Sequence, residues 1–286
     1  MLLTIKSSEI EVTVNTFAGA IESIQDTASG EEHYWPYDPA VWPRRTQICF
    51  PICGALPDGK YRHNGKEYSL PPHGFLREKE LQVESQREDE IVFSLVSDGT
   101  TRENYPFDFR FELTERVFGR SLEIVYKVRN TGNDDMFFSV GAHYTYALPA
   151  AQKDCCYFFS QPQKAGRIMR KSGRLEYDSA DIFGGKDKLS MDGLFDPSSV
   201  IVELCEINSE YIAIGTEQGL FTKVSGEGFP YLVLWAPPGG SSPFACIEYW
   251  AGMGEYEGND GELAHKKGIN RLLPGEERLF TQRITV

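Results

Sequence analysis

The chain has 286 residues, of which 41% are hydrophobic and 25% charged, as is ordinary for a soluble globular protein. Its net charge of −13 and pI near 4.9 argue against nucleic acid or an anionic membrane surface as the main partner. The N-terminal residues lack the long apolar core of a signal peptide, and no apolar run approaches the length of a membrane span. We therefore expect a cytoplasmic protein that binds neither nucleic acid nor membrane.

The cysteines give the same indication of compartment. Neither Cys-x-x-Cys nor a His/Cys metal-ligand spacing occurs among the six, which are Cys49, Cys53, Cys155, Cys156, Cys205 and Cys246. The pattern is typical of buried, reduced thiols and predicts no metal site. Gly-x-Ser-x-Gly, the P-loop and Gly-x-Gly-x-x-Gly are also missing from the sequence. We expect no nucleotide or other cofactor.

Hydrophobic and polar residues alternate along much of the chain, the pattern of half-buried antiparallel strands. The clearest cases are residues 9–14, 107–113 and 122–128, with a hairpin turn expected at 118–120. Further strands are expected at 90–96, 135–147, 156–160, 200–205, 211–216, 219–224, 230–235, 244–250 and 278–285. Short helical turns are expected only at 178–183 and 260–267. Many short strands predict an all-β fold, a large antiparallel sandwich or barrel, in a single domain over residues 1–286.

Glu248 lies within the apolar and aromatic stretch that runs from Phe244 to Gly252. In a strand its side chain would point to the same face as those of Phe244, Cys246 and Trp250. A carboxylate among such neighbours is costly unless it has partners or a function. The stretch leaves two alternatives open, a solvated carboxylate at a strand end and a functional one.

Histidine is rare in this sequence, so each copy can be considered singly. Two prolines precede His73 and a glycine follows it, which predicts a well-defined loop suited to a binding site, although a surface loop histidine is the alternative. His143 lies in an apolar strand candidate, either as a core histidine or as a general acid or base. His33, His63 and His265 lie beside turn or charged residues and are expected to be exposed.

Four stretches, in this order, carry a resemblance to a known family. They are Phe50-Pro51-Ile52-Cys53-Gly54, Pro72-His73-Gly74-Phe75, Gly141-Ala142-His143 and Cys246-Ile247-Glu248-Tyr249-Trp250. Asp58-Gly59-Lys60-Tyr61 and the closing Leu273-Pro274-Gly275-Glu276 also fit. Together they resemble the galactose mutarotase-like superfamily, in the aldose 1-epimerase branch that includes LacX-type proteins. The resemblance implies a large β-sandwich with an open cleft for a pyranose.

The resemblance also implies a role for each of three residues. Glu248 would be the general base that takes the proton from the anomeric hydroxyl. His143 would be the general acid that protonates the ring oxygen, and His73 would hold and polarise the sugar near that oxygen. Ring opening, rotation about C1–C2 and reclosure would then interconvert the anomers of a hexose without a metal or a redox partner.

The chain departs from the family at one position that usually contacts the sugar. Ala55 stands where the family often has an arginine. Arg44, Arg45 and Arg77 are the nearby candidates for a replacement cation. We favour Arg77 as a substrate-binding residue; the alternative is an exposed surface arginine.

The second departure concerns the sugar-binding aspartate of the better-known mutarotases. It has no secure match here; Asp196 is nearby, and Ser198 could hold the site instead. Aromatic side chains could offer apolar faces to the C–H surface of the sugar, or could be core residues. The candidates are Phe75, Tyr144, Trp235 and Trp250.

Three hypotheses follow from these observations. The favoured one is an aldose 1-epimerase that acts on a free hexose, as a monomer or homodimer. A hexose-6-phosphate 1-epimerase could use Arg45 and Arg77 for the phosphate, but the charge of −13 disfavours it. A non-catalytic carbohydrate-binding protein on the same fold is the third, and the alanine at position 55 makes it conceivable.

Overall fold

The computed structural model describes residues 1–43, 47–164, 167–171, 174–178, 181–195, 202–205, 208–256 and 258–286. Its strands are β1 (Leu2–Lys6), β2 (Ile10–Asn15), β3 (Ala20–Asp26), β4 (Gln47–Cys49), β5 (Lys60–His63), β6 (Lys66–Ser69), β7 (Gln82–Gln86), β8 (Glu90–Val96), β9 (Phe109–Phe118), β10 (Ser121–Asn130), β11 (Met136–Phe138), β12 (Val140–His143), β13 (Thr145–Ala147), β14 (Cys156–Phe159), β15 (Arg167–Lys171), β16 (Arg174–Asp178), β17 (Lys188–Ser190), β18 (Val202–Cys205), β19 (Ile212–Thr216), β20 (Gly219–Glu227), β21 (Tyr231–Trp235), β22 (Phe244–Ala251), β23 (Asn270–Leu272) and β24 (Glu277–Thr285).

Helical structure is confined to short segments in the described chain. They are α1 (Gly99–Asn104) and the 3₁₀ turns η1 (Pro57–Gly59), η2 (Leu76–Glu78), η3 (Gln152–Asp154) and η4 (Leu263–His265). Within the described ranges, none of the helices has the length and apolar character that a membrane span requires. The predominance of strands confirms the predicted all-β class.

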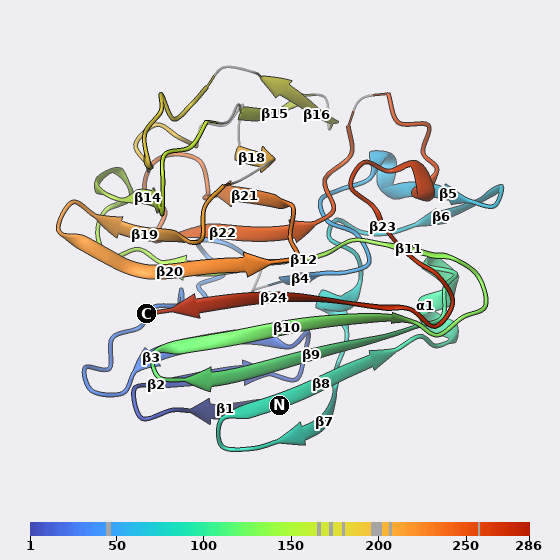
Figure 1. The fold of residues 1–286 in the computed structure, drawn as a ribbon, viewed down its shortest axis with the longest axis horizontal. Coiled ribbons are helices and arrows are strands. Elements are labelled where there is room, and N and C mark those ends of the chain that lie inside the picture. The colour runs from blue at the N-terminus through green and yellow to red at the C-terminus, as the bar shows by residue number, and fades with distance from the viewer. Residues whose placement is uncertain are drawn as a thin grey trace.

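Two large antiparallel sheets make up most of the molecule. One has nine strands in the order β17-β14-β19-β20-β24-β10-β9-β8-β7. The other has the order β18-β21-β22-β12-β4, with β13 also paired to β22. Figure 1 shows β24, β10, β9 and β8 side by side, with β21 and β22 above them in this view. The smaller sheets are β1-β2-β3, β5-β6, β11-β23 and β15-β16.

The core lies on the inner faces that the period-two pattern predicted. In β10 the alternate residues Leu122, Ile124, Tyr126 and Val128 are all fully buried. One buried hydrophobic cluster extends from Ile5 to Ile284 and takes side chains from both large sheets. This shared core supports our proposal that residues 1–286 form a single domain.

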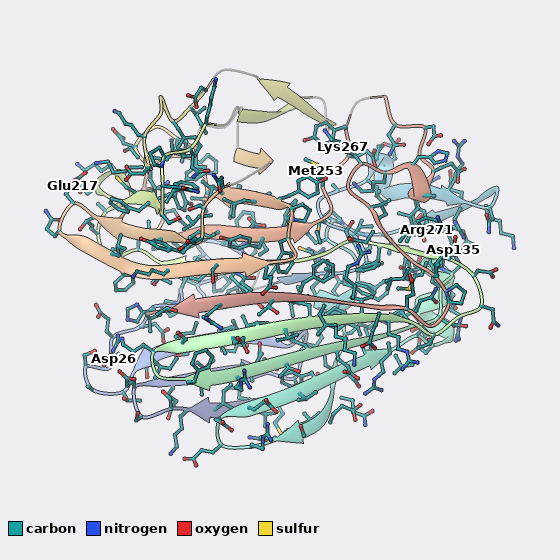
Figure 2. The ribbon with its side chains drawn as sticks, viewed as in Figure 1. Asp26, Asp135, Glu217, Met253, Lys267 and Arg271 are labelled. Carbon is teal, nitrogen blue, oxygen red and sulfur yellow. The ribbon has the colours of Figure 1, made fainter. Side chains whose placement is uncertain are left out.

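Ion pairs between charged side chains connect neighbouring elements; Figure 2 labels Asp26, Asp135 and Arg271. Arg271 in β23 donates to Asp135, just before β11, at 2.8 Å. Asp26, the last residue of β3, forms an ion pair with Arg120 in the β9–β10 turn. The Ser29 backbone N–H and the Arg120 guanidinium hold the pKa of the Asp26 carboxyl well below its usual range. The second pair joins the three-stranded sheet to the nine-stranded one.

Several predicted elements have different bounds in the structure. The strand expected at 107–113 begins at Phe109 and continues to Phe118, because the chain turns just before it, where the Phe107 N–H donates to Tyr105 O. The strand expected at 135–147 is divided into β11, which pairs with β23, and β12 and β13, which pair with β22; β12 also pairs with β4. Between β11 and β12, the Ser139 N–H donates to Pro51 O at 2.7 Å, which leads the chain from one partner to the next.

The helical predictions were less accurate. Residues 260–267 hold only the single turn η4. In 178–183, Asp178 ends β16 and residues 181–183 are not helical, whereas 179–180 lie outside the described residues. Of the strand expected at 200–205, residues 202–205 form β18, and residues 200–201 lie outside the described residues.

The expectation that His33 is exposed was wrong. Its side chain is buried, because the ring stacks on Phe221 of β20 with centroids 4.2 Å apart. His63 is half-buried against Phe107, at 4.7 Å between ring centroids. His265 is exposed, as expected, and pairs with Asp260.

Candidate active site

Glu248 lies in the middle of β22, a strand that is buried along its whole length. Strand β21 pairs with one edge of β22, where Val233 is opposite Glu248, and β12 and β13 pair with the other. The side chains of Cys246 and Trp250 share a buried cluster, as the predicted alternation requires. Glu248 is 1% exposed, which rules out a solvated carboxylate at a strand end.

His143 is the last residue of β12 and reaches Glu248 because β12 packs closely on β22. A Cβ at Gly141 would lie 2.5 Å from Cδ1 of Trp250, so only glycine allows this approach. The His143 Nε2 atom is 3.5 Å from Oε1 of Glu248. On the other side of the ring, Nδ1 is 3.5 Å from Sγ of Cys246.

His73 lies in the predicted loop, which is clamped to the segment 49–54. Its φ of 65° is in the left-handed region, a conformation that needs support from the surroundings when the residue is not glycine. The His73 N–H donates to Gly54 O at 2.7 Å, and its carbonyl accepts from Phe50 N–H at 3.1 Å. A Cβ at Gly74 would lie 2.2 Å from Phe50 O, so the next position requires glycine as well.

These hydrogen bonds fix the direction of the His73 ring. Its Nδ1 accepts from the Gly54 N–H at 3.3 Å and lies 3.2 Å from Sγ of Cys49. The ring meets that of His143 edge-on, with centroids 5.6 Å apart. The three residues that the ordered motifs singled out therefore converge.

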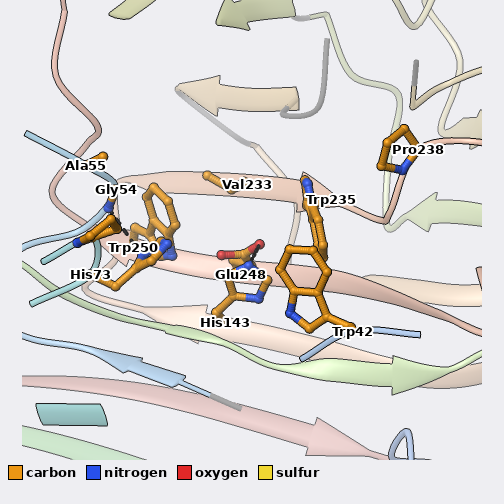
Figure 3. A pocket seen from close by; sticks show the side chains of 11 residues that line it. Trp42, Gly54, Ala55, His73, His143, Val233, Trp235, Pro238, Glu248 and Trp250 are labelled. Atoms are coloured by element: carbon orange, nitrogen blue, oxygen red, sulfur yellow. Dashed lines mark hydrogen bonds and ion pairs between the residues drawn. The ribbon is translucent and has the colours of Figure 1, made fainter. Parts of the chain in front are cut away.

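They converge on one cavity of about 350 Å³, a volume suited to a small ligand. In Figure 3, Glu248 and His143 lie in the middle of the cavity. Trp250 and His73 are on one side of them, and Trp235 and Trp42 are on the other. The cavity is lined by Trp42, Gly54, Ala55, Pro72, His73, His143, Val233, Trp235, Pro238, Glu248 and Trp250. Most of the wall is apolar, and its few polar side chains lie together.

Arg77, which we expected to bind the substrate, is not among the residues that line this cavity. It is not the exposed surface arginine of the alternative either, since its side chain is only 6% exposed. The side chain lies within the turn η2, where Nη2 is 3.6 Å from Oε1 of Glu78. The buried position of Arg77, outside the lining of this cavity, gives no support to its role as a substrate-binding residue.

Ala55 does line the cavity, at the position where an arginine was expected. Among the lining residues of the described chain, none is a lysine or an arginine. The other residues proposed for the missing sugar contacts lie outside the described residues; they are Arg44, Arg45, Asp196 and Ser198.

The aromatic candidates divide into two groups. Trp235 and Trp250 line the cavity as expected, whereas Phe75 and Tyr144 belong to the core. Trp42, on the loop before β4, was missed, although its ring lies 4.7 Å from that of Trp235. Nothing in its local sequence distinguishes it from a surface tryptophan, and only its contact with β21 places it in the wall.

The ligand atoms of His143, Cys246 and Glu248 all lie within 4.8 Å of one another, close enough to hold a metal ion. Sequence spacing did not reveal this cluster because β12 and β22 are far apart in the chain. In the present arrangement the sulfur faces Nδ1 and the carboxylate faces Nε2, whereas a metal ion binds one ring nitrogen. Burial and the Glu248 charge also raise the pKa of the Cys246 thiol, which opposes thiolate ligation. The geometry favours a hydrogen-bonded acid–base group.

The chain is similar to known proteins in sequence and in fold. The sequence profile of the aldose 1-epimerase family matches residues 1–157. Protein LacX (chromosomal) of Lactococcus lactis is 25% identical over 300 residues, which cover 100% of this chain and 99% of that protein. A galactose mutarotase related enzyme from Lactobacillus acidophilus superposes with a TM-score of 0.92 and 27% identity, over 100% of this chain and 97% of its own.

A galactose mutarotase-like protein from Lactobacillus casei has the same fold, with a TM-score of 0.91 and 22% identity over 100% of this chain and 99% of its own. The large antiparallel sandwich is therefore that of the galactose mutarotase-like proteins. The chain belongs to the aldose 1-epimerase family, which confirms the resemblance carried by the ordered motifs.

Proposed function

We propose that this protein is an aldose 1-epimerase that interconverts the α and β anomers of a free hexose. The observation that carries the proposal is the convergence of Glu248, His143 and His73 on one small cavity. The carboxylate and the imidazole are the base and the acid that sugar ring opening needs, and they lie 3.5 Å apart before substrate enters.

The reaction begins when Glu248 takes the proton from the anomeric hydroxyl. His143 delivers a proton from Nε2 to the ring oxygen as the bond from that oxygen to C1 breaks, which leaves the open-chain aldehyde. Rotation about C1–C2 presents the opposite face of the carbonyl. In reclosure, the hydroxyl that came from the ring oxygen attacks C1 and returns its proton to His143, while Glu248 returns the other proton to the new anomeric oxygen.

The structure also positions these groups before the substrate binds. β22 is paired on both edges, so the carboxylate is held in place before the sugar arrives. His73, in its clamped loop, presents a hydrogen-bond donor next to His143. Trp42, Trp235 and Trp250 offer flat apolar surfaces to the C–H faces of the pyranose.

The described wall of the cavity supports a free hexose as the substrate. A phosphorylated sugar would require cationic side chains, and the lining residues of the described part include neither lysine nor arginine. Ala55 also makes room where a family arginine would stand. These features favour a free hexose over a hexose 6-phosphate.

The test is an anomerisation assay by NMR on α-glucose, α-galactose and α-glucose 6-phosphate. We expect acceleration above the spontaneous rate on at least one free hexose, and a smaller effect on the phosphate ester. Acceleration of the phosphate ester alone would overturn the substrate assignment. A wild-type protein that binds hexose without accelerating any substrate would instead be a carbohydrate-binding protein.

The proposal places the enzyme in a reducing cytoplasm, as a monomer or homodimer. Support for the compartment comes from the five cysteines with described side chains, all of which are buried free thiols.

A further inference from the structure

Each of the two site histidines has a cysteine thiol next to Nδ1. Sγ of Cys49 lies 3.2 Å from Nδ1 of His73, and Sγ of Cys246 lies 3.5 Å from Nδ1 of His143. Burial raises the pKa of both thiols well above their ordinary value, with further contributions from Cys53 at Cys49 and from Glu248 at Cys246. Both sulfurs therefore carry their proton, and a thiol can donate a weak hydrogen bond or accept one.

The two histidines differ in what else contacts Nδ1. At His73 the Gly54 backbone N–H donates to Nδ1 at 3.3 Å, and a backbone N–H cannot accept. The Nδ1 lone pair must be bare for this bond to exist, so the proton of the neutral ring is on Nε2. His73 is then a fixed hydrogen-bond donor.

At His143 the thiol of Cys246 imposes no such restriction. It can donate S–H to a bare Nδ1, or rotate so that the sulfur accepts from Nδ1–H. A histidine that gives its Nε2 proton to a substrate must keep a proton on Nδ1, both as the imidazolium and as the neutral ring that remains. Cys246 permits this pair of states, whereas the Gly54 amide forbids it at His73.

We propose that Cys246 is a positioning residue whose sulfur accepts the Nδ1–H of His143, so that His143 and not His73 can serve as the general acid. This inference rests on the proposed function and deepens it. Within the described residues, the titratable groups that face the His143 ring are Cys246 and Glu248 from β22 and His73 from the loop 71–75. β21 contributes the uncharged ring of Trp235.

Three variants separate a positioning role from simple packing. Cys246→Ala removes the acceptor, Cys246→Ser replaces it with a hydroxyl that can also donate and accept, and Cys156→Ala removes a buried thiol from β14 as a matched control. We expect Cys246→Ala to lower kcat about 10-fold with little change in KM, and to change the pH profile. Cys246→Ser should recover most of the loss, and Cys156→Ala should show none. Thermal melting checks that each variant is folded.

Nitrogen-15 NMR of the histidine rings gives a readout that does not depend on activity. We expect Nδ1 of the neutral His73 ring to carry no proton, and Nδ1 of His143 to carry a proton that Cys246→Ala destabilises. The proposal is overturned if the His143 signals and the pH profile are the same in Cys246→Ala as in the wild type. It is equally overturned if the kcat of Cys246→Ser is no higher than that of Cys246→Ala. A wild-type protein without anomerisation activity would refute the proposed function, while the ring signals would still test the role of the thiol.

Discussion

Glu115 is a carboxylic acid in the core of the sandwich, on the inner face of β9, and its exposed fraction is 0%. Both carboxyl oxygens lack a hydrogen-bond partner within the described residues. Burial raises the pKa of this group from 4.5 to about 8. The folded protein therefore holds Glu115 in its neutral form at pH values where the unfolded chain has already lost the proton.

The sign of the effect on stability follows from proton binding. Between pH 4.5 and about 8 the native state binds one proton more than the unfolded state at this site, so stability falls as pH rises. The slope approaches 1.4 kcal/mol per pH unit, and the fall between pH 5 and pH 7 is about 2.5 kcal/mol. A loss of this size is a large fraction of a typical stability of about 5–15 kcal/mol.

Glu115→Gln removes the ionisation and keeps the shape. Urea unfolding at pH 5, 6 and 7 should show that the difference in unfolding free energy, variant minus wild type, rises by about 2.5 kcal/mol over this range. The buried amide adds an offset that does not depend on pH, so the slope is the quantity to compare. Glu217→Gln, at a side chain that is 69% exposed, serves as the control. If the unfolding free energy of Glu115→Gln changed with pH as steeply as that of the wild type, Glu115 would not have a raised pKa in the folded protein.

Two further substitutions test the site. In Gly74→Ala the added Cβ would lie 2.2 Å from Phe50 O; we expect about 2–4 kcal/mol of destabilisation in urea and a reduced kcat, because the loop must move His73. Unchanged stability and activity would show that the loop is not clamped as described. Trp235→Ala removes one apolar wall of the cavity, so KM for the hexose should rise about 10-fold while kcat changes less. A fall in kcat with KM constant would contradict a role in sugar binding.

Much of the fold could be predicted because its strands have one apolar and one polar face. β10 follows the period-two pattern, and in β22, which is buried on both faces, the predicted parity of Glu248 with Cys246 and Trp250 was correct. The helix α1 was missed because its start depends on one local signal: Asp98 accepts from the Thr101 N–H in a capping box. No apolar periodicity accompanies that signal in so short a helix.

What could not be predicted depends on contacts between distant segments. His33 has polar neighbours in sequence but is covered by Phe221 of β20. Arg77 follows His73 by four residues, yet the turn η2 directs it into the protein interior. The contact between Cys246 and His143 joins two strands that are far apart in the chain, so spacing along the sequence could not reveal it.

We propose Glu248 as the base of an anomerisation reaction. The most direct test follows a freshly dissolved α-hexose by NMR with equal amounts of wild-type protein, Glu248→Gln and the exposed control Glu217→Gln. We expect the enzymatic rate of folded Glu248→Gln to be about 10²–10⁴-fold lower than that of the wild type, and the control to match the wild type. A Glu248→Gln variant that anomerises the sugar at the wild-type rate would show that Glu248 is not the base.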